Sequence, residues 1–403
     1  MYQEENLVKI AKRENNKKRN YLVINRLQGK HSPVKPHEAF DMFKALAAPL
    51  REQYTGERLL LIGFAETATA IGAAVALELG AAYMQTTREQ VPDVNYLYFS
   101  EEHSHATEQK LVKNDIDGVI NDIDRIIFIE DEVTTGKTIL NIIGILETLY
   151  PDTVHYSVAS ILNGMDEDAL KVYEHRGIKL HWLVKTNHAA YTNIAEAYRG
   201  DGKYIVCSTQ NCVLDTVEEQ QCYRFSGCSE KIKLENLPIE SLKEGCFQTV
   251  DSRNIRQKMG QFMNTRRLVD PKQYADFCEG LYLDILSCID LKHIDRLLVL
   301  GTEEFMYPPL YVAERFEAQG KDVWFHATTR SPITVSTEKE YPLHVRYELK
   351  SFYDAERITY IYDLDKYDCV LVITDADGET KEGFRSLRDA LLLSGNENVV
   401  FVY

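Results

Sequence analysis

Short apolar runs alternate with segments of helical periodicity along the first half of the chain. The runs expected to form strands are RLLLIG (58–63), AAYMQTTRE (81–89), RIIFIED (125–131), TVHYSVASIL (153–162) and IKLHWLVKT (178–186). The segments expected to form helices are 37–48, 66–80, 137–150 and 166–177. Continuously apolar strands separated by helices are typical of a parallel sheet covered on both faces. The pattern therefore predicts an α/β domain with a mainly parallel, Rossmann-like sheet.

The same alternation weakens between residue 200 and about residue 265 and then resumes. Further strands are expected at 296–301, 322–329, 369–375 and 399–403, and further helices at 274–286, 309–320 and 383–395. We therefore predict a flexible leader over 1–20, a first domain over 21–200, an interdomain linker over 201–265 and a second, smaller α/β domain over 266–403. LLLIGFAE (59–66) and LLVLGTEE (297–304) are alike, which either duplication or convergence explains.

Acidic residues outnumber basic ones, which narrows the classes of partner. The chain has 62 Asp and Glu against 46 Lys and Arg, a formal net charge of −16. This charge disfavours duplex nucleic acid and anionic membranes, although the basic stretch RRLVDPK (266–272) leaves RNA binding open. The first twenty residues lack the apolar core of a secretory signal. We therefore expect a cytoplasmic protein with reduced cysteines and no membrane partner.

The stretch IIFIEDEVTTGKT (126–138) places polar chemistry at the end of a buried strand. Open α/β sheets bind ligands at the carboxyl ends of their strands. A helix is expected to begin near Lys137, so the first amides of that helix would be exposed beside the positive end of its dipole. Thr134, Thr135, Gly136, Lys137 and Thr138 therefore predict a phosphate-binding loop.

Two acids, Glu130 and Asp131, come directly before this loop. They suit the vicinal hydroxyls of a sugar, or a Mg²⁺ ion that bridges hydroxyls and a second phosphate group. Phosphoribosyl pyrophosphate (PRPP) carries a monophosphate at one end, a diol in the middle and a pyrophosphate at the other end. The alternative is a Thr-rich cap of an ordinary strand-to-helix turn, but two carboxylates at a strand end are costly without a cation or donors.

The acid pair followed by Thr-Thr-Gly-Lys-Thr resembles the PRPP signature of type I phosphoribosyltransferases. It is not a Walker A loop, because Asp131 stands where that loop needs a glycine. NRLQGKHSPVKP (25–36), IGFAETATAIG (62–72) and SEEHSHATEQ (100–109) further resemble the orotate phosphoribosyltransferase-like family of tellurium-resistance and stress gene clusters. Members of that family have a C-terminal domain with a Thr-Arg-Ser-Pro (TRSP) motif, which this chain has at 329–332 beside GTEEFMYPPL (301–310).

The resemblance implies roles for other segments of the first domain. The loop after the first core strand would bind pyrophosphate through Gly63, Ala65, Glu66, Thr67, Ala68 and Thr69. Many relatives have Lys or Arg in this loop, so Glu66 favours Mg²⁺ or a Lys from elsewhere as the cation. His103 and His105 would carry protons in a loop that closes over the reaction centre; a metal site with Glu101 and Glu102, or a plain surface loop, are the alternatives. Lys30 and His31 would contact the base or the pyrophosphate.

A second group of polar residues belongs to the C-terminal domain. Arg330, Ser331, Glu303, Glu304 and Tyr307 would form a second site, complete the first site across the domain interface, or make a structural ion pair. The cysteines at 207, 212, 222, 228 and 246 have no standard zinc-binding spacing. Reduced thiols are therefore the favoured interpretation and zinc is the alternative.

The resemblance implies a Mg²⁺-dependent phosphoribosyltransferase acting on PRPP. The acceptor would be a nitrogen of a small base, and Thr134 favours a pyrimidine-like one, since purine-specific relatives usually have Asp there. Glu130 and Asp131 would hold the ribose or the metal. The alternative function is a non-catalytic protein that senses PRPP and regulates another process. A homodimer is a further expectation.

Overall fold

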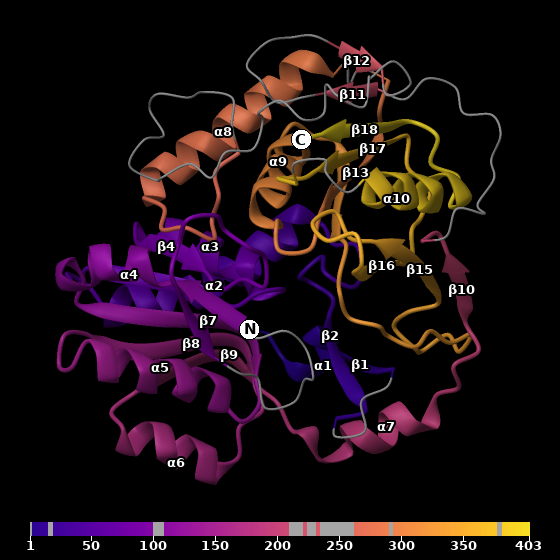
Figure 1. Ribbon diagram of the computed structural model, residues 1–403. Helices are drawn as coiled ribbons and strands as arrows, with labels where there is room; N and C mark the ends of the chain where they lie inside the picture. Colours follow the sequence, from indigo (N-terminus) through magenta and orange to yellow (C-terminus); the bar gives the residue numbers. More distant parts are fainter. Residues whose placement is uncertain are drawn as a thin grey trace.

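The computed structural model describes residues 2–14, 19–99, 109–208, 262–289, 293–376 and 381–403, together with the backbone of 221–223 and 231–233. Two α/β domains lie against each other (Figure 1). No helix in this described part of the chain is long and apolar enough to cross a membrane.

The N-terminal domain is built on a parallel sheet with the strand order β4-β3-β7-β8-β9. Its strands and their intervening helices are β3 (Leu59–Gly63), α3 (Ala68–Leu79), β4 (Ala82–Gln85), β7 (Arg125–Val133), α5 (Lys137–Leu149), β8 (His155–Asn163), α6 (Glu167–His175) and β9 (Lys179–Lys185). Helix α2 (Pro36–Gln53) precedes β3. The predicted parallel α/β sheet is confirmed, with strand and helix ends shifted by a few residues, which is ordinary for sequence-based boundaries.

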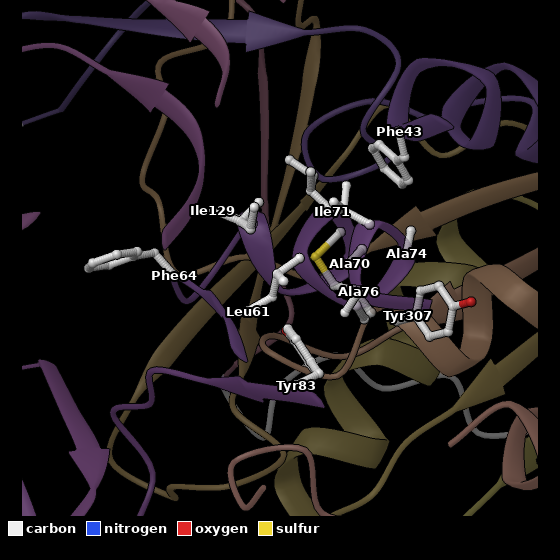
Figure 2. Close-up of a cluster of buried hydrophobic side chains, with 14 of the residues drawn as sticks. Phe43, Leu61, Phe64, Ala70, Ile71, Ala74, Ala76, Tyr83, Ile129 and Tyr307 are labelled. Carbon is white, nitrogen blue, oxygen red and sulfur yellow. The ribbon is translucent and has the colours of Figure 1, made fainter. Parts of the chain in front are cut away.

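Buried apolar side chains explain why β3 and β7 lie in the middle of this sheet. Ile126–Ile129 are wholly buried, as expected for a strand covered on both faces. Helix α3 is buried on every side from Ala68 to Ala76, because it packs on β3, α2 and the C-terminal helix α9. Figure 2 shows this cluster, in which Phe43 of α2 and Tyr307 of α9 approach α3.

A close backbone contact fixes the end of β3. A Cβ atom added to Gly63 would lie 2.7 Å from the Tyr83 hydroxyl and 2.8 Å from the Ala68 carbonyl oxygen, and one added to Gly72 would lie 2.9 Å from Gly63 Cα. Only glycine allows helix α3 to pass so near the strand end. The start of the loop after β3 is thereby fixed against the helix.

Smaller elements complete the N-terminal domain and correct one prediction. Helix α1 (Glu4–Leu7) and strand β1 (Val8–Lys12) lie within the expected flexible leader, and β1 pairs antiparallel with β2 (Tyr21–Asn25). Residues 4–12 are therefore folded, because Leu7, Ile10 and Ala11 are buried. The remaining elements are the antiparallel pair β5 (Tyr96–Phe99) and β6 (Gln109–Val112), α4 (Lys113–Val119), the 3₁₀ turns η1 (Ile120–Asp122) and η2 (His188–Ala190), and α7 (Tyr191–Ala197).

The C-terminal domain has a sheet with the order β12-β11-β18-β17-β13-β14, in which only the β11–β12 pair is antiparallel. Its elements are α8 (Pro271–Cys288), β13 (Arg296–Gly301), α9 (Tyr307–Ala318), β14 (Asp322–Ala327), β17 (Cys369–Ile373), α10 (Lys381–Leu393) and β18 (Val399–Val402). The antiparallel pair β15 (Val345–Lys350) and β16 (Ile358–Tyr362) was not predicted. Its side chains are mixed in polarity, so no apolar run marks it.

The segment predicted as a linker contributes strands to this second domain. Strand β10 (Lys203–Val206) pairs parallel with β15, and β11 (Gln221–Tyr223) pairs parallel with β18. Strand β12 (Lys231–Lys233) pairs with β11. The expected linker over 201–265 is therefore wrong at these strands, which pair with C-terminal partners that lie far away in sequence.

Candidate functional site

The strand order positions the candidate site. The chain passes from β3 to its neighbour β4 on one side, and from β7 to its neighbour β8 on the other side. The crevice at such a reversal is where open α/β sheets bind ligands. The loops after β3 and β7 both begin at this point, and the Phe64 amide donates to the Ile129 carbonyl at 3.0 Å. The two predicted binding loops are therefore neighbours.

The loop after β7 has the geometry expected of a phosphate-binding loop. Helix α5 begins at Lys137, as predicted, with Gly136 as its N-cap residue. Thr134, Thr135 and Thr138 are partly exposed, and Lys137 is exposed. First-turn amides of a helix carry the positive end of its dipole. The loop can therefore bind an anion through its amides, hydroxyl groups and one ammonium group.

Gly136 adopts a backbone conformation that favours glycine. Its φ is +69°, and an added Cβ atom would lie 2.5 Å from the Tyr173 hydroxyl and 2.7 Å from Met165 Cε. The Tyr173 hydroxyl donates to the Gly136 carbonyl oxygen at 2.6 Å. The turn is thus held from beneath by a tyrosine of α6, while its polar side remains available to a ligand.

The acids that precede this loop alternate in direction. Strand β7 continues to Val133, two residues beyond the predicted end, with Glu130 opposite Ser160 and Glu132 opposite Leu162 on β8. Successive side chains on a strand point to opposite faces. Glu130 and Asp131 therefore extend from opposite sides of the strand end, and a ligand that both contact must lie across the end of β7.

Glu132 is a third acid that sequence analysis passed over. Its carboxylate accepts from Arg19 Nη2 at 2.6 Å and lies 3.4 Å from His188 Nε2. Burial and neighbouring Glu132 raise the pKa of Asp131 to about 6. A buried acid with an acidic neighbour gains from an added cation or donor. Arg19 lies 113 residues from Glu132, so no local pattern announces their contact.

The loop after β3 is held mainly through its backbone. The Ala65 amide donates to Thr86 Oγ1 at 2.8 Å, and the Ala65 carbonyl accepts from Gln109 Nε2 at 3.0 Å. Thr69 Oγ1 donates to the Glu66 carbonyl at 3.0 Å, and α3 begins at Ala68 after its N-cap Thr67. The loop therefore runs into the N-terminus of a buried helix, where anion-binding amides are expected.

The Glu66 side chain faces cations from two distant segments. Its carboxylate lies 3.2 Å from Lys30 Nζ and accepts from the Arg330 amide, also at 3.2 Å. Burial raises the pKa of Glu66, but the charges of Lys30 and Arg330 outweigh it, so its pKa lies below the ordinary value. The cations that the sequence appeared to lack are thus present beside this loop, and they neutralise Glu66.

Lys30 and His31 are buried rather than placed over a ligand. Lys30 Nζ donates to the carbonyls of Glu303 at 2.7 Å and Thr328 at 2.8 Å, in addition to its contact with Glu66. All three donors of this ammonium group therefore point to protein acceptors. Burial lowers the pKa of His31 to about 3, so its ring is neutral. The predicted contact of these residues with base or pyrophosphate is absent from this arrangement.

Glu101, Glu102, His103 and His105 lie outside the described residues. Strands β5 and β6 flank the segment that contains them. The roles predicted for His103 and His105 therefore stay predictions.

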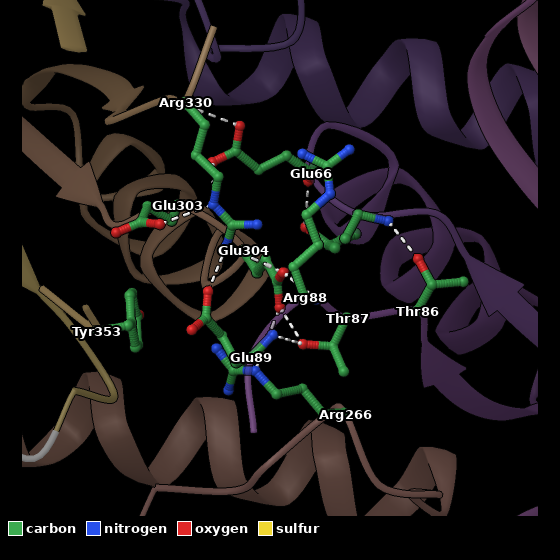
Figure 3. A network of polar contacts seen from close by, with 12 residues as sticks. Glu66, Thr86, Thr87, Arg88, Glu89, Arg266, Glu303, Glu304, Arg330 and Tyr353 are labelled. Atoms are coloured by element: carbon green, nitrogen blue, oxygen red, sulfur yellow. Dashed lines mark hydrogen bonds and ion pairs between the residues drawn. The ribbon is translucent and has the colours of Figure 1, made fainter. Parts of the chain in front are cut away.

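Part of the predicted second group forms a buried ion cluster at the domain interface (Figure 3). Arg330 Nε donates to Glu303 at 2.8 Å, and its Nη2 donates to Glu89 at 2.5 Å and to Glu304 at 3.0 Å. Arg357 contacts Glu89 and Glu303, and Arg266 contacts Glu304 and Asp375. The arrangement satisfies the alternative in which the TRSP arginine joins the first domain to the second.

Two members of that predicted group lie elsewhere. Tyr307 packs in the apolar layer between the domains, against the rings of Phe40, Tyr274 and Tyr311. The Ser331 amide donates to Thr329 Oγ1, and its carbonyl accepts from the Tyr362 hydroxyl. Neither residue contributes its side chain to the ion cluster, because Tyr307 starts helix α9 and faces the core.

The ion cluster predicts sensitivity to acid. Burial raises the pKa of Glu304, but Arg330 and Arg266 outweigh it and lower the pKa to about 2. A carboxyl whose pKa is lower in the folded state stabilises the protein fully above its ordinary pKa and loses that contribution as the pH falls. Stability should therefore fall between about pH 5 and pH 2. Urea unfolding at pH 6 and pH 3 should show a smaller difference for Glu304→Gln than for the unchanged protein; an equal difference would contradict this assignment.

No group of three or more His, Cys, Asp or Glu residues within the described ranges is arranged to hold a metal ion by itself. Cys207 is buried, and Cys212, Cys228 and Cys246 lie outside those ranges, as does the side chain of Cys222. The zinc alternative therefore stays untested.

Comparison with known families agrees with the fold and the loops. Residues 7–193 match the model of a phosphoribosyl transferase family, and residues 284–391 match the TRSP domain that lies C-terminal to it. The chain belongs to this phosphoribosyltransferase family, a class of transferase enzymes, and carries the TRSP domain. The resemblance noted in the sequence is confirmed.

Solved structures similar to this chain include adenine phosphoribosyltransferases. That of Rhodothermus marinus is 15% identical, with 45% of this chain and 96% of that chain covered and a TM-score of 0.33. That of Giardia lamblia, in complex with 9-deazaadenine, is 19% identical, with 45% and 95% covered and a TM-score of 0.32. That of Leishmania tarentolae is 17% identical, with 45% and 85% covered and a TM-score of 0.32. No curated protein matches the chain.

Proposed function

We propose that the protein transfers the 5-phosphoribosyl group from PRPP to a nitrogen of a small base and releases pyrophosphate. The observation that carries this proposal is the meeting of two anion-binding loops, after β3 and β7, at one strand reversal with acids beside them. The 5-phosphate would bind at Thr134–Thr138, and the pyrophosphate at the loop from Gly63 to Thr69.

The bond changes define what the site must do. The acceptor nitrogen forms a bond to C1 of the ribose, the bond from C1 to the pyrophosphate oxygen breaks, and pyrophosphate leaves with the electron pair. The acceptor nitrogen then loses its proton if it carried one. Donors that hold both phosphate ends fix the sugar for in-line attack, and loop amides stabilise the charge that grows on the leaving group.

Glu130 and Asp131 would hold the ribose hydroxyls, directly or through Mg²⁺. The chemistry of the donors fits this ion, since carboxylate oxygens suit it and Asp131 lies beside a second acid without a printed ion pair of its own. When bound, Mg²⁺ would neutralise charge on the pyrophosphate. Glu130 and Asp131 provide two carboxylates, so hydroxyl and pyrophosphate oxygens of the substrate would complete its ligands.

The class of acceptor rests on a narrower argument. Thr134 stands where purine-specific relatives usually have Asp, which favours a pyrimidine-like base. The family resemblance further suggests nucleotide-like metabolism connected to tellurite and stress resistance. The expected homodimer stays a prediction, for which light scattering is the measurement.

An assay of pyrophosphate release tests the proposed reaction. Purified protein with PRPP, Mg²⁺ and a panel of purine and pyrimidine bases should release pyrophosphate in the presence of one base, and more slowly without any base. Calorimetry with PRPP and Mg²⁺ provides the parallel binding measurement. Binding of PRPP with no turnover on any base would favour the PRPP-sensing alternative, and absence of binding would refute both functions.

A further inference from the structure

The C-terminal domain repeats the architecture of the N-terminal domain. Its strand order β14-β13-β17-β18 matches β4-β3-β7-β8. Helices α2 and α8 both have 18 residues and begin at a proline before the first of these strands, and α5 and α10 both have 13 residues and begin at a lysine after the third. The likeness of 59–66 to 297–304 therefore lies at equivalent positions of two related folds.

The equivalence extends to individual hydrogen bonds. The tripeptide Thr-Thr-Arg follows both second strands, at 86–88 and at 328–330. The Thr86 amide donates to the Gly63 carbonyl at 2.9 Å, and the Thr328 amide donates to the Gly301 carbonyl at 3.1 Å. The Ala65 amide donates to Thr86 Oγ1, as the Glu303 amide does to Thr328 Oγ1. Each unit thus fastens its first loop by the same contacts.

Reciprocal contacts then join the two units across their interface (Figure 3). Glu304 of the second unit accepts from Thr87 Oγ1 at 2.7 Å and from the Arg88 amide at 2.9 Å. Glu66 of the first unit accepts from Thr329 Oγ1 at 3.1 Å and from the Arg330 amide at 3.2 Å. Such mutual contacts between equivalent residues are typical of a two-fold interface, here formed within one chain.

Edge pairing obeys the same exchange. Val34, just before α2, pairs with Phe325 of β14, and Val269, just before α8, pairs with Tyr83 of β4. Each unit therefore extends the sheet of the other unit. The second unit occupies the position of a partner subunit.

The two units differ at the strand that carries the acids. Asp375 follows β17 at the position equivalent to Asp131, because Leu300 pairs with Val372 as Ile62 pairs with Phe128. Asp375 accepts from Arg266 Nη1 at 2.6 Å and from the Tyr353 hydroxyl at 2.5 Å. Protein side chains thus satisfy this acid in the second unit, whereas Asp131 lies in the proposed PRPP site.

We propose that Thr329 and Arg330 of the TRSP motif are positioning residues for the pyrophosphate loop of the first unit, acting through Glu66. This inference rests on the proposed function in assigning pyrophosphate to that loop. A loop carboxylate near a bound pyrophosphate would repel it. The Thr329 hydroxyl, the Arg330 amide and Lys30 hold the Glu66 carboxylate in a buried, neutralised position, so the loop amides can face the ligand.

Hydrogen exchange tests the positioning without any ligand. Thr329→Val should speed exchange of the amides in 63–69 and leave those in 302–306 unchanged. The matched control Thr87→Val removes the equivalent contact to Glu304, and should speed exchange in 302–306 while leaving 63–69 unchanged. Thr329→Ser keeps the hydroxyl group and should restore slow exchange. Unchanged exchange of 63–69 in Thr329→Val would overturn the proposal.

Binding measurements test the functional consequence. Thr329→Val should weaken PRPP binding about tenfold, as the loss of one hydrogen bond to a charged group implies, and should leave ribose 5-phosphate binding unchanged. Thr87→Val should lower Tm comparably and leave both affinities unchanged. Equal weakening of both ligands in Thr329→Val, or equal PRPP weakening in the two variants, would overturn the proposal. If the unchanged protein binds no PRPP, the proposed function fails, while hydrogen exchange still decides the positioning role.

Discussion

Asp131→Asn is expected to lower kcat/KM for PRPP at least about a hundredfold, because the carboxylate would contact the ribose or its metal while charge develops at C1. PRPP affinity in calorimetry should fall as well. The fold should persist, since the substitution removes one of two neighbouring acids and the pKa of Asp131 is raised to about 6. Tm should therefore not fall.

Asp375→Asn is the matched control for this prediction. It removes the equivalent acid of the second unit, which contacts Arg266 and Tyr353. We expect Asp375→Asn to lower Tm and to leave PRPP affinity unchanged. PRPP affinity that is unaffected by Asp131→Asn, or equally affected by both substitutions, would show that β7 does not carry the site.

Gly136→Ala is expected to abolish binding of both PRPP and ribose 5-phosphate and to lower the free energy of unfolding by about 2–4 kcal/mol. The backbone at Gly136 has φ of +69°, and the new methyl group would overlap Tyr173 and Met165. The turn must then move, and the amides of the phosphate-binding loop move with it. Calorimetry and urea unfolding measure the two effects.

Gly177→Ala separates the backbone cost from the overlap. Gly177 has φ of +68°, but no atom lies within 4 Å of its added Cβ. This substitution should cost only about 1 kcal/mol of stability, with ligand binding intact. If the two substitutions destabilise the protein equally and both leave ribose 5-phosphate binding intact, the phosphate does not bind at this turn.

The duplicated architecture gives a physical reason for the acidic and basic residues around Arg330. Glu303 and Glu304 have fully buried side chains, and a buried carboxylate without a partner would be strongly destabilising. Arg330, Arg357 and Arg266 provide those partners. Because Glu66 and Glu89 of the first domain join the same cluster, the two domains share one set of charges, and neither would keep it alone.

Local pattern determined much of the first domain. The buried strand 126–129, the turn at Gly136 and the start of α5 at Lys137 follow from an apolar run, a residue that tolerates positive φ and a cluster of hydroxyl groups, all within thirteen residues. Hydrophobic periodicity and turn chemistry are short-range properties. The phosphate-binding loop was therefore predictable from sequence alone, as was the parallel order of strands and helices around it.

Tertiary structure alone decided which charges meet. Arg19 reaches Glu132, Lys30 and Arg330 reach Glu66, and the expected linker supplies strands to the second sheet. These contacts join residues separated by up to 264 positions, and no spacing along the chain records them. Ion pairs form between whichever side chains the packed layers bring within a few ångströms. The amino-acid sequence thus determined the elements and the loop chemistry, and the packing of two related domains decided the partners of Glu66.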